Sequence, residues 1–213
     1  MSRLAAKRRS EPAATAASAD VPGLKLALAG LAVSSPSTFS TATTTRNKSM
    51  TTRKVEIERV SFTSSKPFDA VVASIKAAVG QPDMAEFRQA TRSAQSFAEL
   101  ERIVQGGLGS TGLMLFMELD LGGILRRESG LETPKIIRFV IGNPLTMKEM
   151  AKHVPDAGSY APVTILVDER RDGVHLSYDK MASLLAPYGS PEAIAVARDL
   201  DTKIERLLRE AAS

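Results

Sequence analysis

The chain contains no cysteine and only two histidines. Without cysteine there is no disulfide, no thiolate nucleophile, no iron–sulfur cluster and no cysteine-based zinc site. The histidines, His153 and His175, have no second ligand at a spacing that suits a metal. The sequence therefore predicts neither a metal site nor a cofactor, and it leaves the redox compartment open.

Acidic residues are scarce in residues 1–50, which carry seven Lys or Arg side chains against only Glu11 and Asp20. Residues 51–213 are close to neutral, with 21 basic and 22 acidic residues. A domain that binds nucleic acid carries a basic face on the fold itself. We therefore predict no nucleic-acid partner.

Residues 1–50 are rich in Ala, Ser and Thr and almost free of aromatic residues, so they cannot bury enough apolar surface to offset the entropy of ordering. Their one apolar run, residues 24–33, is too short to span a bilayer, and we predict no transmembrane segment. The composition fits an organelle transit peptide, a secretory signal, or a segment outside the fold, which is either a disordered basic extension or a start placed too early, with Met50 as the true start. We favour the last, and with it a cytoplasmic location; a transit peptide would direct the protein to the mitochondrial matrix.

Residues 51–213 begin with strand and helix patterns. Apolar residues alternate over residues 55–58 and resume out of phase at Val60 and Phe62, which indicates a first strand with a bulge. Apolar spacing of three and four residues predicts a helix over residues 68–79 that ends at Gly80. A short helix follows over residues 83–90, and the capping box from Ser96 to Glu99 opens another that runs to residue 104.

The second half of the chain reads as strands followed by a long helix. The nearly continuous apolar run at residues 113–119 predicts a strand buried on both faces. Strands follow at residues 136–141 and 163–167, and the turn at residues 172–173 makes the last pair of strands a hairpin. An apolar stripe over residues 194–211, capped by Ser190 before Pro191, predicts the C-terminal helix.

We therefore predict one α+β domain over residues 51–213. Its antiparallel sheet has about four to five strands, with helices packed on one face and a long C-terminal helix. The other face carries Ile136, Val140 and Leu166 and is less polar than a solvated face. A partner subunit, the segment at residues 81–111 or a bound apolar ligand would each cover it.

A set of glycines, prolines and acids at the ends of these elements resembles the domain of unknown function 302 family. The resemblance covers residues 53–212 and rests on Gly112, Asp120, Gly130, Leu131, Pro134, Gly142, Asn143, Pro144, Pro162, Asp168, Gly173, Tyr178 and Asp179. The chain departs from the family in having Leu121 where many members place a histidine, in an insertion at residues 81–111, and in its N-terminal extension. The resemblance implies a compact α+β domain, often a dimer, with no agreed activity.

The glycines at residues 107–112 match the pattern G-x-G-x-x-G, and Glu132 follows at the spacing of a dinucleotide site. That site needs a strand before the glycines and a helix after them, so that the helix amides meet the pyrophosphate. Here the predicted helix comes first and the strand second. We therefore predict no dinucleotide cofactor.

Five residues are candidates for ligand binding: Asn143, Tyr160, His175, Tyr178 and Asp179. Asn143 before Pro144 has the character of a helix N-cap, and an anion at that helix terminus is the functional alternative. Tyrosines offer an apolar ring and a polar tip, which suits a cleft at loop and strand ends. No residue is predicted to be catalytic.

The function predicted from the sequence is a small-molecule-binding homodimer without demonstrable catalysis. One alternative is an enzyme that uses Tyr178, Asp179 and His175 for proton transfer in a cleft. Another alternative is an interaction protein whose basic tail directs it to an organelle or to an acidic surface. The lack of cysteine, of a nucleophile elbow and of clustered carboxylates counts against the enzyme.

Overall fold

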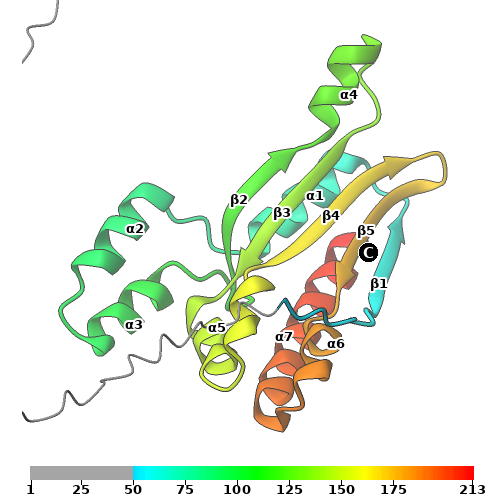
Figure 1. Cartoon of the computed structure of the whole chain (residues 1–213). Coiled ribbons are helices and arrows are strands. Elements are labelled where there is room, and N and C mark those ends of the chain that lie inside the picture. The colour runs from blue at the N-terminus through cyan, green and yellow to red at the C-terminus, as the bar shows by residue number, and fades with distance from the viewer. Residues whose placement is uncertain (1–49) are drawn as a thin grey trace, which may run out of the picture. The chain divides into compact units, whose positions relative to one another are not determined.

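Five strands form one antiparallel sheet in the order β1-β5-β4-β3-β2 (Figure 1). The computed structural model describes residues 50–213, and the predictions for the extension that precedes them lie outside the described residues. The strands are β1 (Arg59–Ser64), β2 (Met114–Asp120), β3 (Ile136–Gly142), β4 (Val163–Arg170) and β5 (Gly173–Asp179). The predicted α+β fold and the hairpin of the last two strands are confirmed.

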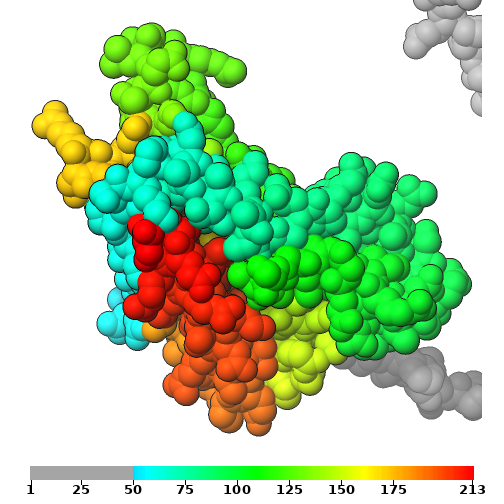
Figure 2. Space-filling view, turned by 180° about the vertical axis from the view of Figure 1, so that it is seen from behind, coloured from blue at the N-terminus to red at the C-terminus, as the bar shows by residue number. Residues whose placement is uncertain are grey.

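Two helices cover one face of this sheet, as predicted. They are α1 (Phe68–Ala78) and the long α7 (Pro191–Ala212), which lie in front of the strands in Figure 2. The remaining helices are α2 (Met84–Ser93), α3 (Phe97–Gly106), α4 (Gly122–Ser129), α5 (Pro144–Ala151) and α6 (Met181–Leu185), with two 3₁₀ turns at Pro155–Ser159 and Ala186–Tyr188. None of the helices among residues 50–213 is long and apolar enough to cross a membrane.

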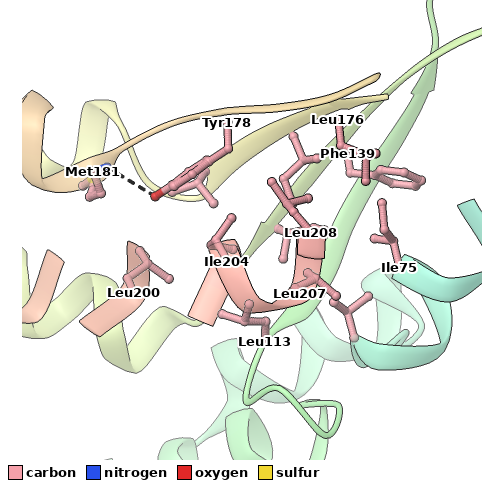
Figure 3. Packing of buried hydrophobic residues seen from close by; sticks show 14 of the residues in the cluster. Ile75, Leu113, Phe139, Leu176, Tyr178, Met181, Leu200, Ile204, Leu207 and Leu208 are labelled. Carbon is pink, nitrogen blue, oxygen red and sulfur yellow. Dashed lines mark hydrogen bonds between the residues drawn. The ribbon is translucent and has the colours of Figure 1, made fainter. Parts of the chain in front are cut away.

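The core lies between the sheet and these two helices (Figure 3). Alternate strand residues such as Phe139, Ile165 and Leu176 point into it, and α7 meets them with an apolar stripe that includes Ile204 and Leu208. Burial of each such side chain contributes about 1.5–3 kcal/mol. The period of two in the strands and the period of 3.6 in the helix therefore determine which face of each element is buried.

Local caps start the helices where the sequence predicted them. The Asp83 carboxylate accepts from the backbone amides of Ala85 and Glu86 at 2.8 and 2.9 Å, and these bonds hold the pKa of Asp83 below its usual value. Ser96 Oγ accepts from the amide of Glu99 at 3.2 Å. The reciprocal bond of the capping box runs from the amide of Gln95, one residue ahead of the cap, to the Glu99 carboxylate.

Two expectations for the strands were wrong, and one helix was not predicted. The first strand begins at Arg59, and residues 55–58 lie outside it, because β1 pairs only with β5 and that partner ends at Asp179. The run at residues 113–119 is not buried on both faces: β2 is an edge strand, and Met117 is 52% exposed. Helix α4 was not predicted; it stands at the end of a β2–β3 projection that extends past the other strands (Figure 1).

The glycine segment at residues 107–112 crosses close to the backbone that follows α1. Helix α3 precedes it and β2 follows, which is the order that argued against a dinucleotide site. Gly80 and Gly109 lie so close that a Cβ built on Gly109 would be 2.4 Å from the backbone nitrogen of Gly80. The amides of both glycines donate to the carbonyl of Leu113 at 2.9 Å, which fixes the start of β2 against the end of α1.

Gly109→Ala should destabilise the domain by about 1–3 kcal/mol, because the added methyl group would overlap backbone atoms that cannot rotate away. Gly106→Ala is the control, since a Cβ at that position meets nothing within 4 Å. The free energy of unfolding from urea titrations measures both variants. Equal unfolding midpoints for the two variants would contradict the close backbone approach.

Candidate functional site

The face of the sheet opposite α1 and α7 is open toward the viewer in Figure 1. In the part of the chain that the structure describes, no helix lies across the middle of this face. The insertion at residues 81–111, which was one of the predicted covers, forms α2, α3 and the glycine crossing, and its helices pack against each other and α5. The open face is therefore the place where side chains meet solvent or a partner.

Strand register lines up the side chains of this face in rows. One row consists of Ser61, Ser177, Leu166, Arg138 and Leu119, one from each strand. The adjacent row consists of Arg59, Asp179, Thr164, Val140 and Met117. Residues in one row are about 4.5–5.5 Å apart between neighbouring strands, so polar and apolar groups lie close together on this face.

A hollow lies over the middle of these two rows. We call it the open-face hollow; Arg138, Thr164, Leu166, Ser177 and Asp179 line it, and its volume is about 320 Å³. A second depression of about 250 Å³ adjoins it through Arg138, Thr164 and Asp179. Ligand sites of small molecules commonly have volumes of 300–1,000 Å³ with a few polar groups on an apolar floor, so the hollow has suitable size and lining.

Of the charged side chains in the hollow, two are paired with each other and the third is not paired within residues 50–213. Arg59 donates to both carboxylate oxygens of Asp179, at 2.6 and 2.8 Å, and this pair holds the pKa of Asp179 below its usual value. Arg138 makes no hydrogen bond or ion pair with any residue in the range 50–213. The hydroxyls of Thr164 and Ser177 also have no partner there. The hollow therefore contains one uncompensated positive charge and two free hydroxyls.

Three of the five candidate residues line these depressions, and one of them, Tyr178, lines the open-face hollow although its side chain lies in the core. Asp179 lines both of them, and Tyr160 lines the adjoining one. The Tyr160 hydroxyl lies 3.0 Å from the Tyr188 hydroxyl, and this bond raises the pKa of Tyr188 to about 12. Tyr160 thus lines the depression while its hydroxyl is held by another tyrosine.

Tyr178 has its side chain on the opposite face. It is 1% exposed, and its hydroxyl donates to Asp201 Oδ1 at 2.6 Å (its place in the core is seen in Figure 3). The same carboxylate accepts from the amides of Met181 and Ala182, which begin α6. Burial and the neighbouring Asp201 raise the pKa of Tyr178 far above its usual value. These contacts give Tyr178 a structural role in place of the predicted position in a cleft.

Asp201 was not singled out from the sequence. It lies four residues after Ala197 and three before Ile204, on the buried stripe of α7, and it is 3% exposed. An acid in an apolar stripe is a signal that the sequence does contain, since a carboxylate is buried only where donors satisfy it. The donors themselves could not be named without the tertiary structure.

Asn143 lies in a different place from the tyrosines. Its Oδ1 accepts from the amide of Leu145 at 2.8 Å, which confirms the N-cap, and its Nδ2 donates to the carbonyl of Gly112 at 3.0 Å. The cavity beside it has a volume of only about 140 Å³ and is lined largely by apolar side chains. Both ends of the Asn143 amide are therefore engaged within the protein.

His175 faces the open side of the sheet but lies away from the hollow. Its Nε2 is 3.0 Å from Asp172 Oδ1 in the hairpin turn, and the bond lowers the pKa of Asp172. His175 lies four positions before Asp179 in β5, which corresponds to about 13 Å along a strand. The three side chains of the enzyme alternative, His175, Tyr178 and Asp179, thus do not converge on one point. Within residues 50–213 no three His, Asp or Glu side chains gather around a metal position.

Tyr178→Phe should lower the free energy of unfolding by about 1–3 kcal/mol, because the buried carboxylate of Asp201 would lose a donor. Asn143→Ala should lower it by about 0.5–2 kcal/mol through loss of the cap. Urea unfolding measures both changes.

Tyr188→Phe serves as the control for the tyrosine, since it removes a hydroxyl that is bonded to the half-buried Tyr160 hydroxyl and not to a buried carboxylate. We expect a smaller loss from it. A Tyr178→Phe variant as stable as the unaltered protein would show that the bond to Asp201 contributes nothing.

Comparison with known proteins adds a family and a fold. The family model described as "Domain of unknown function DUF302" matches residues 89–211, more than half of the chain. A crystal structure of an uncharacterized conserved DUF302 protein from Bacillus stearothermophilus has a similar fold, with a TM-score of 0.51 and 11% identity over 72% of this chain and 97% of the other. None of the curated proteins compared with the chain matches it. With the predicted resemblance thus confirmed, the chain belongs to the DUF302 family.

Proposed function

We propose that this domain binds a small molecule in the open-face hollow, and that it does so as a homodimer without catalysing a reaction. The supporting observation is the set of unpartnered polar groups, Arg138, Thr164 and Ser177, arranged around the apolar side chain of Leu166. Few polar groups on an apolar floor are typical of a site that recognises a ligand. The family itself has no assigned activity that would favour another site.

The groups around the hollow favour binding over catalysis. Asp179 is the acid that lines it, and Arg59 occupies both oxygens of that carboxylate. A general base needs a free acceptor within reach of the proton that it removes. Tyr160, which lines the adjoining depression, has its hydroxyl bonded to Tyr188, and the Tyr178 hydroxyl is bonded to Asp201 on the other side of the sheet. We therefore assign Asp179 and Tyr160 to the border of the binding site, and Asn143 and Tyr178 to stability, and we place His175 outside the site.

A second copy of the chain is the proposed partner. The projection between β2 and β3 exposes three large apolar side chains: Ile124 is 71% exposed, Leu131 62% and Leu125 41%. An apolar group of this kind on a soluble domain is typical of an interaction surface. Arg127 and Glu128 lie beside it, exposed and without partners among residues 50–213. A two-fold axis would place each of these charges against its opposite in the other copy.

Ligand binding can be tested with two-dimensional ¹H–¹⁵N NMR spectra of the labelled full chain and a mixture of small fragments. We expect the largest shifts at the amides of Thr164, Leu166 and Ser177. Ser177→Tyr should abolish these shifts by filling the hollow with a residue that strands tolerate. Ser61→Tyr is the matched control, because Ser61 lies in the same row but does not line the hollow.

Two results would refute the binding proposal. One is an unchanged response of the Ser177→Tyr variant, which would place the fragments elsewhere. The other is a set of shifts confined to the small cavity beside Asn143, at Met147 and Met150.

The dimer can be tested by sedimentation velocity of the full chain. We expect a dimer that becomes a monomer in the Ile124→Glu, Leu131→Glu double variant, because two carboxylates would replace the apolar contact. Phe97→Glu, at a 50% exposed position on α3, should leave the dimer intact. A monomeric unaltered protein, or a double variant that remains dimeric, would rule out this interface.

A further inference from the structure

Arg138 is the feature of the open face that the protein itself does not explain. Its direct neighbours in the row are Leu119 on β2 and Leu166 on β4, so no acid stands opposite it. The acid on its diagonal, Asp168, is 8% exposed and accepts from Arg170, whose Nη2 lies 3.2 Å from Asp168 Oδ1. The direct neighbours of Arg138 are therefore apolar, and the acid on its diagonal is already held by another arginine.

The other charges that face the hollow cancel each other. Arg59 and Asp179 form a two-bond pair, and the remaining lining residues are neutral. A guanidinium on an apolar floor is a strong binding group for a planar anion, because it offers parallel N–H donors in a fixed fork. An anion in the hollow would thus meet an attractive charge without a competing one.

We infer that the ligand of the open-face hollow is a small monocarboxylic acid, whose carboxylate binds Arg138 and whose apolar body lies over Leu166 and Leu121. This inference rests on the proposed function and specifies its ligand class. Thr164, on the diagonal of Arg138, offers a hydroxyl to the same carboxylate. Ser177 is two strands from Arg138, about 10 Å away, and offers a hydroxyl to the far end of the ligand.

The surroundings favour a carboxylate over a phosphate. Protein sites for phosphate usually collect several donors, typically from the amides at a helix N-terminus or from a glycine loop. Near this hollow the first amides of α6 already donate to Asp201, and the strand amides belong to the sheet. One guanidinium and one hydroxyl match the single charge of a carboxylate.

Paired probes test the ligand class on the full chain. Benzoate and benzamide have nearly the same shape and differ in charge, and inorganic phosphate has charge without an apolar body. We expect benzoate to shift the amides of Arg138, Thr164 and Leu166 in ¹H–¹⁵N spectra. The affinity for benzamide should be lower than that for benzoate by a factor of about ten or more, as expected for loss of a charge-assisted bond. Phosphate should leave these amides unshifted.

Two variants identify the binding group. Arg138→Gln should weaken benzoate by about tenfold or more and leave benzamide unchanged, since only the charged pair is removed. It should also leave the melting temperature unchanged, because Arg138 is exposed and has no protein partner in residues 50–213. Arg92→Gln, an exposed arginine on α2, is the control and should bind benzoate as the unaltered protein does.

The outcomes separate this inference from the proposed function. Equal affinity of the hollow for benzoate and benzamide would refute the inference that the ligand is a carboxylate. Benzoate binding that survives Arg138→Gln would refute it too. In both cases the proposal that the hollow binds a small molecule would stand. If phosphate displaces benzoate from the hollow, the inferred ligand class is wrong, and the ligand carries a phosphate group instead of a carboxylate. If neither these probes nor any neutral or cationic fragment shifts the amides of the hollow, both the inference and the proposed function fail.

Discussion

The arrangement of the open face depends on the hydrogen bonds that the buried carboxylate of Asp201 accepts. It accepts from the Tyr178 hydroxyl at 2.6 Å and from the amides of Met181 and Ala182 at 2.7 and 3.1 Å. A carboxylate in the core is tolerated only when donors satisfy its oxygens. Here the donors come from the end of β5 and the start of α6, so α7 holds both elements in place.

This contact determines which residues reach the open face. Because Tyr178 points toward α7, its neighbours Ser177 and Asp179 must point the other way. A shift of the strand by one residue would put the tyrosine on the open face and the serine and aspartate in the core. The polar groups of the hollow are thus a consequence of a hydrogen bond on the opposite side of the sheet.

Glycine and asparagine contacts place the other border of the hollow. The close approach of Gly80 and Gly109 and the bond from Asn143 Nδ2 to the Gly112 carbonyl hold the start of β2. From there β2 runs along β3 and ends at Asp120, so that Leu121 reaches the edge of the hollow. Asn143 was a candidate for ligand binding, and Gly109 belongs to the glycine pattern of a nucleotide site. In the structure both residues position the strands around the hollow.

The sequence by itself determined the features that depend on neighbours within a few residues. The caps at Ser96, Asn143 and Ser190, the alternation of β3 to β5 and the stripe of α7 all follow from local geometry, and they establish the α+β class. Family membership followed from the same local pattern, since its glycines and prolines mark the ends of these elements.

Only the tertiary structure decided which strand lies at an edge, where β1 begins and which face each polar side chain serves. Arg59 meets Asp179 across 120 positions of sequence, and Asp201 meets Tyr178 through packing of a helix on a sheet. Such pairs depend on strand order and register, which the alternation of apolar residues along one strand does not specify. For the same reason Arg138 could not be singled out from the sequence: what distinguishes it is the absence of an opposing acid in residues 50–213, and that is a property of its neighbours in space.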